Sequence, residues 1–198
     1  MKINVALIAI AIFGLSAGTA NAATPGFGME ENISLSTSAH SASTTLIGQS
    51  IQIKSETVSQ RNAKNKAKSY LRYSSFSRKG LIEQLKFEGF NTKDATYGVD
   101  ANKVNWNLQA VKKGKSYLSN SSFSRTGLIE QLVFEGFTKV QATYGVNKSN
   151  ANWNLQAVKK AKSYLKYGSF SRQGLIDQLL FEGFTNSQAS YGVNRTGL

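Results

Sequence analysis

The sequence of 198 residues predicts an all-α protein in which three small helix-turn-helix repeats form a tandem array. Three observations lead to this prediction. One phrase of sixteen residues occurs three times, at 75–90, 122–137 and 169–184, so that its anchors recur every 47 residues. Within each copy, leucine and isoleucine recur at helical spacing, and a serine before them and a glycine after them mark the two ends of a helix. A period of this length is typical of units that bury their apolar faces against one another.

The start of the chain has the features of a secretory signal peptide over 1–22. Lys2 precedes an apolar run at 5–15, and the small-residue motif Ala20-Asn21-Ala22 follows it. We therefore expect cleavage between Ala22 and Ala23 and an extracytoplasmic product, which is secreted, periplasmic or associated with the cell surface. The apolar run is short for the ~30 Å of hydrocarbon that a transmembrane helix crosses. Retention of the segment as an anchor is the alternative.

Residues 23–60 are predicted to be a flexible linker, because they are rich in Ser and Thr and hold the only proline and the only histidine, Pro25 and His40. Charge changes at the end of this segment. Residues 61–198 carry 22 Lys or Arg against 8 Asp or Glu, a net charge of +14, whereas the first 60 residues carry −1. Cationic repeats favour an anionic partner; the alternative is that the excess lysine only solvates exposed helix faces. The chain has no cysteine, which excludes disulfides, a cysteine-based zinc site and lipid attachment through cysteine.

The first helix of each repeat is predicted from the residues at its two ends. A serine hydroxyl accepts an unpaired backbone N–H at a helix start, and glycine adopts the left-handed conformation that ends a helix. These pairs are Ser77 with Gly89, Ser124 with Gly136, and Ser171 with Gly183. A second helix follows within one or two residues. Its N-cap is predicted to be Asn91 or Thr92 in the first copy, Thr138 (with Gln141) in the second and Thr185 (with Gln188) in the third.

A third predicted helix connects each repeat to the next, at 105–118 and 152–165. Its apolar residues, which include Trp106 and Trp153, cover more than half of the helix circumference, which is more than one packing partner needs. We therefore expect these connecting helices to be shared between neighbouring repeats and to couple the array. An opening helix at 61–71 aligns with them. The predicted repeats are 61–107, 108–154 and a truncated third copy at 155–198.

The first repeat reads KAKSYL at 66–71, FSR at 76–78, GLIEQL at 80–85, EGF at 88–90 and NWN at 105–107. This string closely resembles the Ltp-like helix-turn-helix repeat of host cell surface-exposed lipoproteins, notably superinfection-exclusion proteins of temperate phages in lactic acid bacteria. The resemblance covers three copies in residues 61–198. It implies an all-helical array outside the membrane that stops a phage genome from crossing by binding an injected phage protein, such as the tape-measure protein. Family members are typically acylated at a cysteine, which this chain lacks.

Two sets of basic residues are candidates for contact with a partner. One set lies on the connecting helices and comprises Lys112, Lys113, Lys115, Lys159, Lys160 and Lys162. The other is an arginine in the first turn of each repeat's first helix: Arg78, Arg125 and Arg172. The helix macrodipole disfavours a cation in that turn. A repeated arginine there indicates contact with an anion, a structural bond to Glu83 or Glu88 of the same copy, or simply a recent duplication of the repeat.

The repeated aromatic residues are predicted to pack in the core, because they lie on periodic apolar faces. They are Phe76, Phe87, Phe90, Tyr97 and Trp106 with their counterparts. A base-stacking platform is the alternative. We do not expect sequence-specific reading of DNA, since the second helices carry few basic residues for contact with base edges. Sequence-independent contact with phosphates remains open.

The sequence does not assemble a catalytic site. His40 lies in the linker, and paired carboxylates such as Glu83 and Glu88 are five residues apart, so that the two do not share a helix face. We therefore predict a non-enzymatic protein without catalytic residues, metal, cofactor or small-molecule substrate. The predicted function is an exported binding module that blocks phage genome entry by binding a phage tape-measure-like protein or another anionic surface partner. The alternative is a cationic protein that binds a cell-wall polymer or a nucleic-acid backbone.

Overall fold

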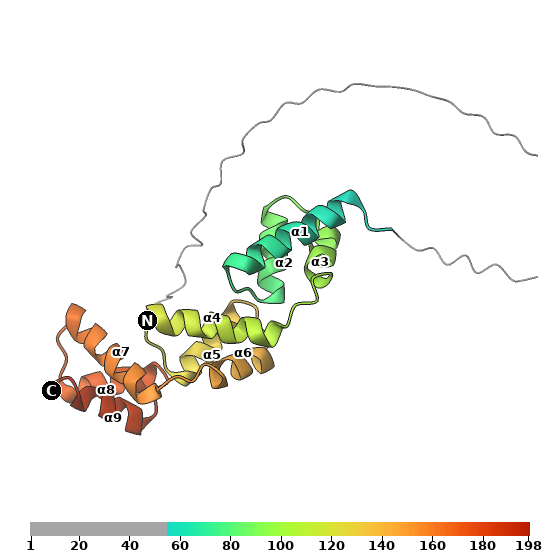
Figure 1. The fold of residues 1–198 in the computed structure, drawn as a ribbon. Helices are drawn as coiled ribbons and strands as arrows, with labels where there is room; N and C mark the ends of the chain where they lie inside the picture. Colours follow the sequence, from blue (N-terminus) through green and yellow to red (C-terminus); the bar gives the residue numbers. More distant parts are fainter. Residues whose placement is uncertain (1–54) are drawn as a thin grey trace, which may run out of the picture. The chain divides into compact units, whose positions relative to one another are not determined.

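A computed structural model describes residues 55–198, which form nine α-helices and no strand (Figure 1). The helices are α1 (Val58–Tyr73), α2 (Arg78–Phe87), α3 (Thr92–Asp100), α4 (Trp106–Asn120), α5 (Arg125–Phe134), α6 (Lys139–Asn147), α7 (Trp153–Tyr167), α8 (Arg172–Phe181) and α9 (Asn186–Asn194). They repeat in groups of three, which confirms the predicted all-α array. Within 55–198, no helix has both the length and the apolar character that crossing a bilayer would take. The predicted signal peptide and residues 23–54 of the predicted linker lie outside the described residues.

Helix α1 begins at Val58, three residues earlier than the sequence predicts. The reason is a capping box at its N-terminus. The Thr57 hydroxyl accepts the backbone N–H of Gln60 at 3.1 Å, and the Gln60 side chain accepts the backbone N–H of Thr57 at 3.1 Å. Residues 58–60, which the sequence assigns to the linker, are therefore helical. Apolar periodicity does not reveal this first turn, because Val58 is exposed.

The predicted caps of the remaining helices are confirmed, whereas α1, α4 and α7 each end two residues later than predicted, at Tyr73, Asn120 and Tyr167. The N-cap serines accept the backbone N–H groups of Gly80, Gly127 and Gly174. The glycines that follow α2, α5 and α8 have φ angles of +93°, +91° and +86°, the left-handed conformation that closes these helices. In the first copy Asn91, rather than Thr92, caps α3 by accepting the backbone N–H of Asp94 at 2.9 Å. Both predicted capping boxes are present at the starts of α6 and α9.

Helices α1 and α3, α4 and α6, and α7 and α9 cross in pairs at a contact between small residues. A Cβ atom at Gly145 would lie 2.7 Å from the carbonyl carbon of Ala110, and one at Gly98 would lie 2.6 Å from the carbonyl carbon of Ala63. Only glycine allows the two backbones to approach so closely. Leu81 and Leu85 of α2 and their counterparts in α5 and α8 fill the space beside each crossing and are fully buried. Each repeat has its own core cluster.

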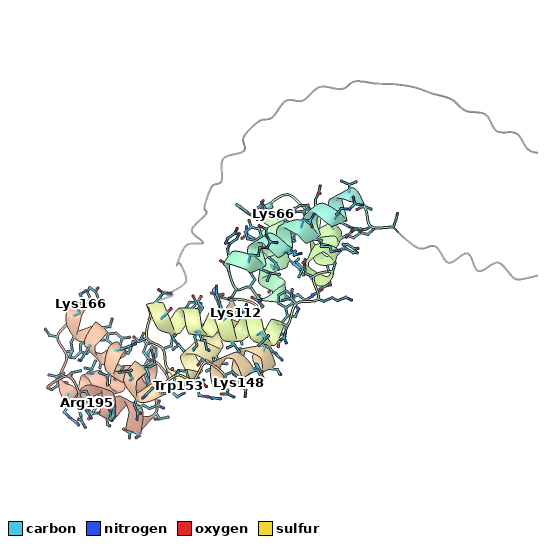
Figure 2. All side chains as sticks on the ribbon, viewed as in Figure 1. Lys66, Lys112, Lys148, Trp153, Lys166 and Arg195 are labelled. Atoms are coloured by element: carbon cyan, nitrogen blue, oxygen red, sulfur yellow. The ribbon has the colours of Figure 1, made fainter. Side chains whose placement is uncertain are left out.

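Connecting helices α4 and α7 each contact two cores. Ala110 in α4 belongs to the second core, whereas Trp106 at the start of the same helix packs against the first. In α7, Ala157 belongs to the third core and Trp153 packs against the second; Trp153 is labelled in Figure 2. These contacts confirm that the connecting helices are shared. Leu108, which lies within the predicted apolar arc of α4, is 51 % exposed, so the buried arc is narrower than predicted.

A hydrogen bond joins consecutive repeats at the N-terminus of α2. The Ser77 hydroxyl, which caps α2, also donates to the carbonyl oxygen of Glu135 at the end of α5, at 2.6 Å. Ser124 makes the same bond to the carbonyl oxygen of Glu182, at 2.6 Å. Both serines are buried, whereas Ser171, which no later repeat contacts within the described residues, is exposed. One hydroxyl thus caps a helix and holds the next repeat.

A buried glutamine on each connecting helix supports the same junction. The Gln109 side-chain oxygen accepts the backbone N–H of Phe76 at 3.4 Å, and Gln156 accepts that of Phe123 at 3.4 Å. The equivalent position in α1 is Asn62, which is exposed. The junction glutamine of α4 and α7 is therefore an asparagine in the opening helix α1.

Candidate functional site

Most carboxylates in residues 55–198 are engaged within the protein itself. Seven salt bridges join Arg61 and Lys64 to Glu56, Lys66 to Glu88, Arg78 to Asp100, Lys86 to Glu83, Lys113 to Glu135, and Lys160 to Glu182. Only seven of the 22 Lys and Arg residues in 61–198 take part in these bridges. The remaining positive charge of the array is therefore available to an anionic partner.

One polar cluster recurs in all three repeats and holds a lysine in place. In the first repeat, Lys66 Nζ lies 2.8 Å from the Glu88 carboxylate, which also accepts a hydrogen bond from the Tyr70 hydroxyl. Gln84 donates to the Tyr70 oxygen at 3.2 Å. The hydrogen bonds from Lys66 and Tyr70 lower the pKa of Glu88 below its ordinary value. In the third repeat, burial and the bond to a glutamate raise the pKa of Tyr164 to about 12.

The six lysines that the sequence suggests as partner contacts fall into two groups, according to whether they belong to this cluster. Lys113 Nζ lies 2.9 Å from Glu135, and Lys160 Nζ lies 2.9 Å from Glu182, so their charges are compensated within their own repeats. The other four are exposed and have no salt bridge among the described residues: Lys112, Lys115, Lys159 and Lys162. Lys112 is labelled on α4 in Figure 2. Among the six predicted lysines, the free charge therefore lies on these four side chains, and Lys166 in the last turn of α7 is exposed and without a salt bridge within residues 55–198 as well.

The repeated arginines bind the last residue of α3, α6 or α9 in their own repeat, and not Glu83 or Glu88 as one sequence interpretation suggests. Arg78 makes two bonds of 2.6 Å to the Asp100 carboxylate. Arg125 donates to the side-chain oxygen of Asn147 at 2.7 and 3.2 Å, and Arg172 donates to that of Asn194 at 2.6 Å. Because asparagine is neutral, the second and third guanidinium groups keep their positive charge while being held in position.

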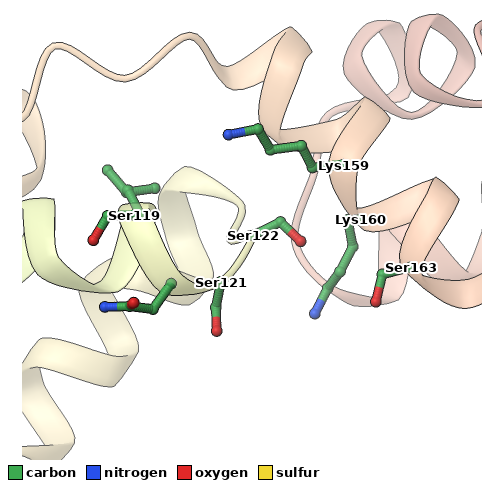
Figure 3. Close-up of a pocket in the computed structure, with 8 residues that line it drawn as sticks. Ser119, Ser121, Ser122, Lys159, Lys160 and Ser163 are labelled. Carbon is green, nitrogen blue, oxygen red and sulfur yellow. The ribbon is translucent and has the colours of Figure 1, made fainter.

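Two equivalent polar grooves lie at the junctions between repeats. The first, of about 320 Å³, lies between the end of α1 and the middle of α4, and Ser75, Lys112 and Lys113 are among its lining residues. The second, of about 380 Å³, lies between the end of α4 and the middle of α7, and Figure 3 shows Lys159 and Lys160 facing this space. Every lining residue of the first groove has its counterpart 47 positions later in the second. No carboxylate lines either groove.

The prediction that the repeated aromatic residues are buried is wrong for one position in each repeat. Phe87, Phe134 and Phe181 are 77 %, 74 % and 82 % exposed. The other counterparts are buried or half-buried, except that Tyr144 and Tyr191 are 39 % exposed. A helical projection could have found this signal. Phe87 lies two residues after the buried Leu85, a rotation of about 200° that places it on the opposite side of α2.

The sequence profile of a family described as host cell surface-exposed lipoproteins matches the chain three times, at 59–101, 105–148 and 152–195. The chain belongs to this lipoprotein family. A solved structure of Ltp, a superinfection exclusion protein from the Streptococcus thermophilus temperate phage TP-J34, is 35 % identical over 46 % of this chain and 95 % of that chain, with a TM-score of 0.44. No curated protein shows significant similarity to the chain.

Membership of the lipoprotein family confirms that the three copies are repeats of the Ltp type. Each family match begins within one residue of the start of α1, α4 or α7 and ends just after α3, α6 or α9, so the profile follows the same three-helix unit that the cores define. The family description supports an extracytoplasmic location. The 198-residue sequence contains no cysteine.

Proposed function

We propose that the protein is an exported, non-enzymatic binding module that blocks phage genome entry by binding an injected phage protein. Membership of a family of surface-exposed proteins supports its place at the envelope, and the Ltp-like repeat is the unit that the resemblance connects with superinfection exclusion. A module at the envelope can contact only those parts of a virion that are pushed through it. The target is therefore an extended injected chain of the tape-measure type.

The observation that carries this proposal is the exposed phenylalanine at the same place in each repeat, formed by Phe87, Phe134 and Phe181. Exposing a large aromatic ring costs solvation free energy, and aromatic side chains are the usual anchors of protein–protein contacts. Three such anchors at a constant interval suit a long partner that presents similar apolar segments one after another. Binding at one repeat raises the effective concentration of the partner at the next.

The experiment is a paired measurement of adsorbed phage and of intracellular phage DNA, in a susceptible host with and without the protein, over a panel of phages. We expect unchanged adsorption and a loss of DNA entry for at least one phage. The test variant replaces the three phenylalanines by serine. Its control is Val140→Ser, since Val140 is 77 % exposed but occurs in only one repeat.

Phage DNA should enter cells that carry the triple variant, whereas the control variant should still block its entry. A variant reduced to one repeat should lose more than two thirds of the protection, because the repeats act together. DNA entry that is unaffected by the protein across a broad panel would reject phage exclusion as its function. Full exclusion by the triple variant would reject the phenylalanines as anchors.

A second candidate function is sequence-independent binding of a polyanion outside the cell. The observation that favours it is the large set of lysines and arginines without a carboxylate partner in residues 61–198. Polyanion binding weakens steeply as salt rises, whereas a shaped protein–protein contact persists. Salt dependence therefore separates the two candidates.

A further inference from the structure

We propose that the two junction grooves are binding sites for the phosphate groups of a polyol-phosphate polymer, a chain of phosphodiesters without bases such as occurs in cell walls. This assignment deepens the polyanion-binding candidate and does not depend on phage exclusion. It identifies the site, the chemistry of the ligand and the reason for having more than one repeat.

The lining of the grooves fits a small anion. Each groove combines an exposed lysine, Lys112 or Lys159, with a second lysine and several serine hydroxyls. Ammonium and hydroxyl groups are donors that phosphate oxygens accept. Since no carboxylate lines the grooves, an entering anion meets no direct repulsion there. One lysine of each groove is already paired with a carboxylate outside the lining: Lys113 with Glu135 and Lys160 with Glu182.

Each groove is lined by two adjacent lysines, of which only one has an uncompensated charge. This favours a polymer with one negative charge per repeating unit. The charges of Lys113 and Lys160 are compensated by their salt bridges to glutamates. Each pair of lysines therefore contributes about one net positive charge, which lies on Lys112 or Lys159. Only the first groove has a further cation, Arg72, where the second has Ser119. A phosphodiester carries one negative charge, so a linear phosphodiester polymer can place one charge in each groove. Each contact is weak alone, and two contacts on one chain reinforce each other.

The aromatic content of the grooves disfavours nucleic acid as the ligand. Proteins that bind single strands without sequence preference use aromatic rings on which bases stack. Tyr73 lines the first groove, but the equivalent residue in the second is Asn120, so the second groove offers no ring. What the two grooves share is lysine, serine and one leucine. Lysine and serine can donate hydrogen bonds to a phosphate and to polyol hydroxyls, whereas the shared set has no aromatic ring on which a base could stack.

The grooves exist only where two repeats meet. Residues at the end of one connecting or opening helix form one wall, and the middle of the next connecting helix forms the other. Three repeats therefore give two sites. The junction bonds made by Ser77 and Ser124 join the same pairs of repeats whose helices form the two groove walls.

The test measures binding of poly(glycerol phosphate) to the exported protein by calorimetry at several salt concentrations. The variant is Lys112→Gln with Lys159→Gln. Its control is Lys115→Gln with Lys162→Gln, which removes the same charge from exposed positions on the same helices outside the groove linings. Oligothymidylate and hyaluronate serve as comparison polymers, the first with bases and the second with carboxylates in place of phosphates.

We expect the groove variant to weaken binding at least about tenfold and to lower the log–log salt slope by roughly 1 to 2, since two phosphate contacts are lost. The control should weaken binding by less than about threefold, through its net charge alone. Equal losses in both variants would show diffuse charge attraction and overturn the assignment. So would the absence of binding to poly(glycerol phosphate), equal affinity for hyaluronate, or tighter binding of oligothymidylate. None of these results bears on DNA entry, so the exclusion function is tested separately.

Discussion

The Ser77 hydroxyl lies between two groups that belong to different repeats: it accepts the backbone N–H of Gly80 at 2.8 Å and donates to the carbonyl oxygen of Glu135 at 2.6 Å. A helix N-terminus with unpaired N–H groups thereby meets a helix C-terminus with unpaired carbonyl groups, and one side chain satisfies a group of each. The arrangement recurs at Ser124. Each junction between repeats therefore depends on a residue that the sequence shows only as a helix cap.

Comparison of Ser124→Ala with Ser171→Ala should measure the junction bond. Both serines cap a helix, but only Ser124 also donates to the next repeat. Ser171→Ala should cost about 1 kcal/mol of stability for the lost cap. Ser124→Ala should cost a further ~1–3 kcal/mol, because the Glu182 carbonyl loses a buried donor. Denaturant unfolding of both variants provides the measurement, and equal costs would show that the junction bond contributes nothing.

Replacement of Trp153 by alanine should loosen two repeats at once. Trp153 is half-buried and packs against the second core from the start of α7, so we expect a cost of about 2–3 kcal/mol, below the ~3–5 kcal/mol of a buried tryptophan. Amide hydrogen exchange should accelerate in the second repeat as well as the third. Leu155→Ala is the control, since Leu155 lies on the same helix and is 48 % exposed. Faster exchange in the third repeat alone would contradict a shared connecting helix.

Two glycine-to-alanine changes should have opposite effects. Gly114 is replaced by Ala161 in the third repeat, and a Cβ there would lie 3.8 Å from its nearest neighbour, so Gly114→Ala should stabilise the protein by about 0.5–1 kcal/mol. A Cβ at Gly145 would lie 2.7 Å from the backbone of Ala110, so Gly145→Ala should destabilise it by ~1–3 kcal/mol or more. Melting temperatures will show the two signs, and destabilisation by both changes would mean that α4 has no room at Gly114.

Acid should weaken the first repeat through Glu88. Bonds from Lys66 and Tyr70 hold the pKa of Glu88 in the folded protein below its ordinary value of 4.5, so the unfolded chain takes up the proton first as the pH falls. The stability that Glu88 contributes is therefore complete above pH 4.5 and is lost as the pH falls through the lower, folded pKa. The contribution should be under about 1 kcal/mol, because the pair is partly exposed to solvent. Glu88→Gln should remove this part of the pH dependence of unfolding, and an unchanged pH profile would show that the pair does not contribute.

Local patterns in the sequence determined where the helices lie. Serine, threonine and asparagine caps act over three residues, and glycines act where they stand, so Ser124, Gly136 and Thr138 identify their helix ends without knowledge of the fold. The threefold phrase likewise determined the number of repeats and their family. The first turn of α1 is an exception, because its only signal is the Thr57–Gln60 spacing in a segment without apolar periodicity.

The tertiary structure alone decided which surface is free. The bond from Ser77 to Glu135 spans 58 residues, and the salt bridge from Lys113 to Glu135 depends on how two helices pack; no local spacing encodes either contact. For that reason the sequence predicts the same partner-binding role for Lys112 and Lys113. In the structure, Lys112 is exposed, whereas Lys113 forms a salt bridge with Glu135. The junction grooves also depend on the tertiary structure, because their walls come from helices that meet only when consecutive repeats dock. Helix ends depend on residues close together along the chain. A binding surface consists of the side chains that make no long-range contact within the folded protein, so it depends on the tertiary structure.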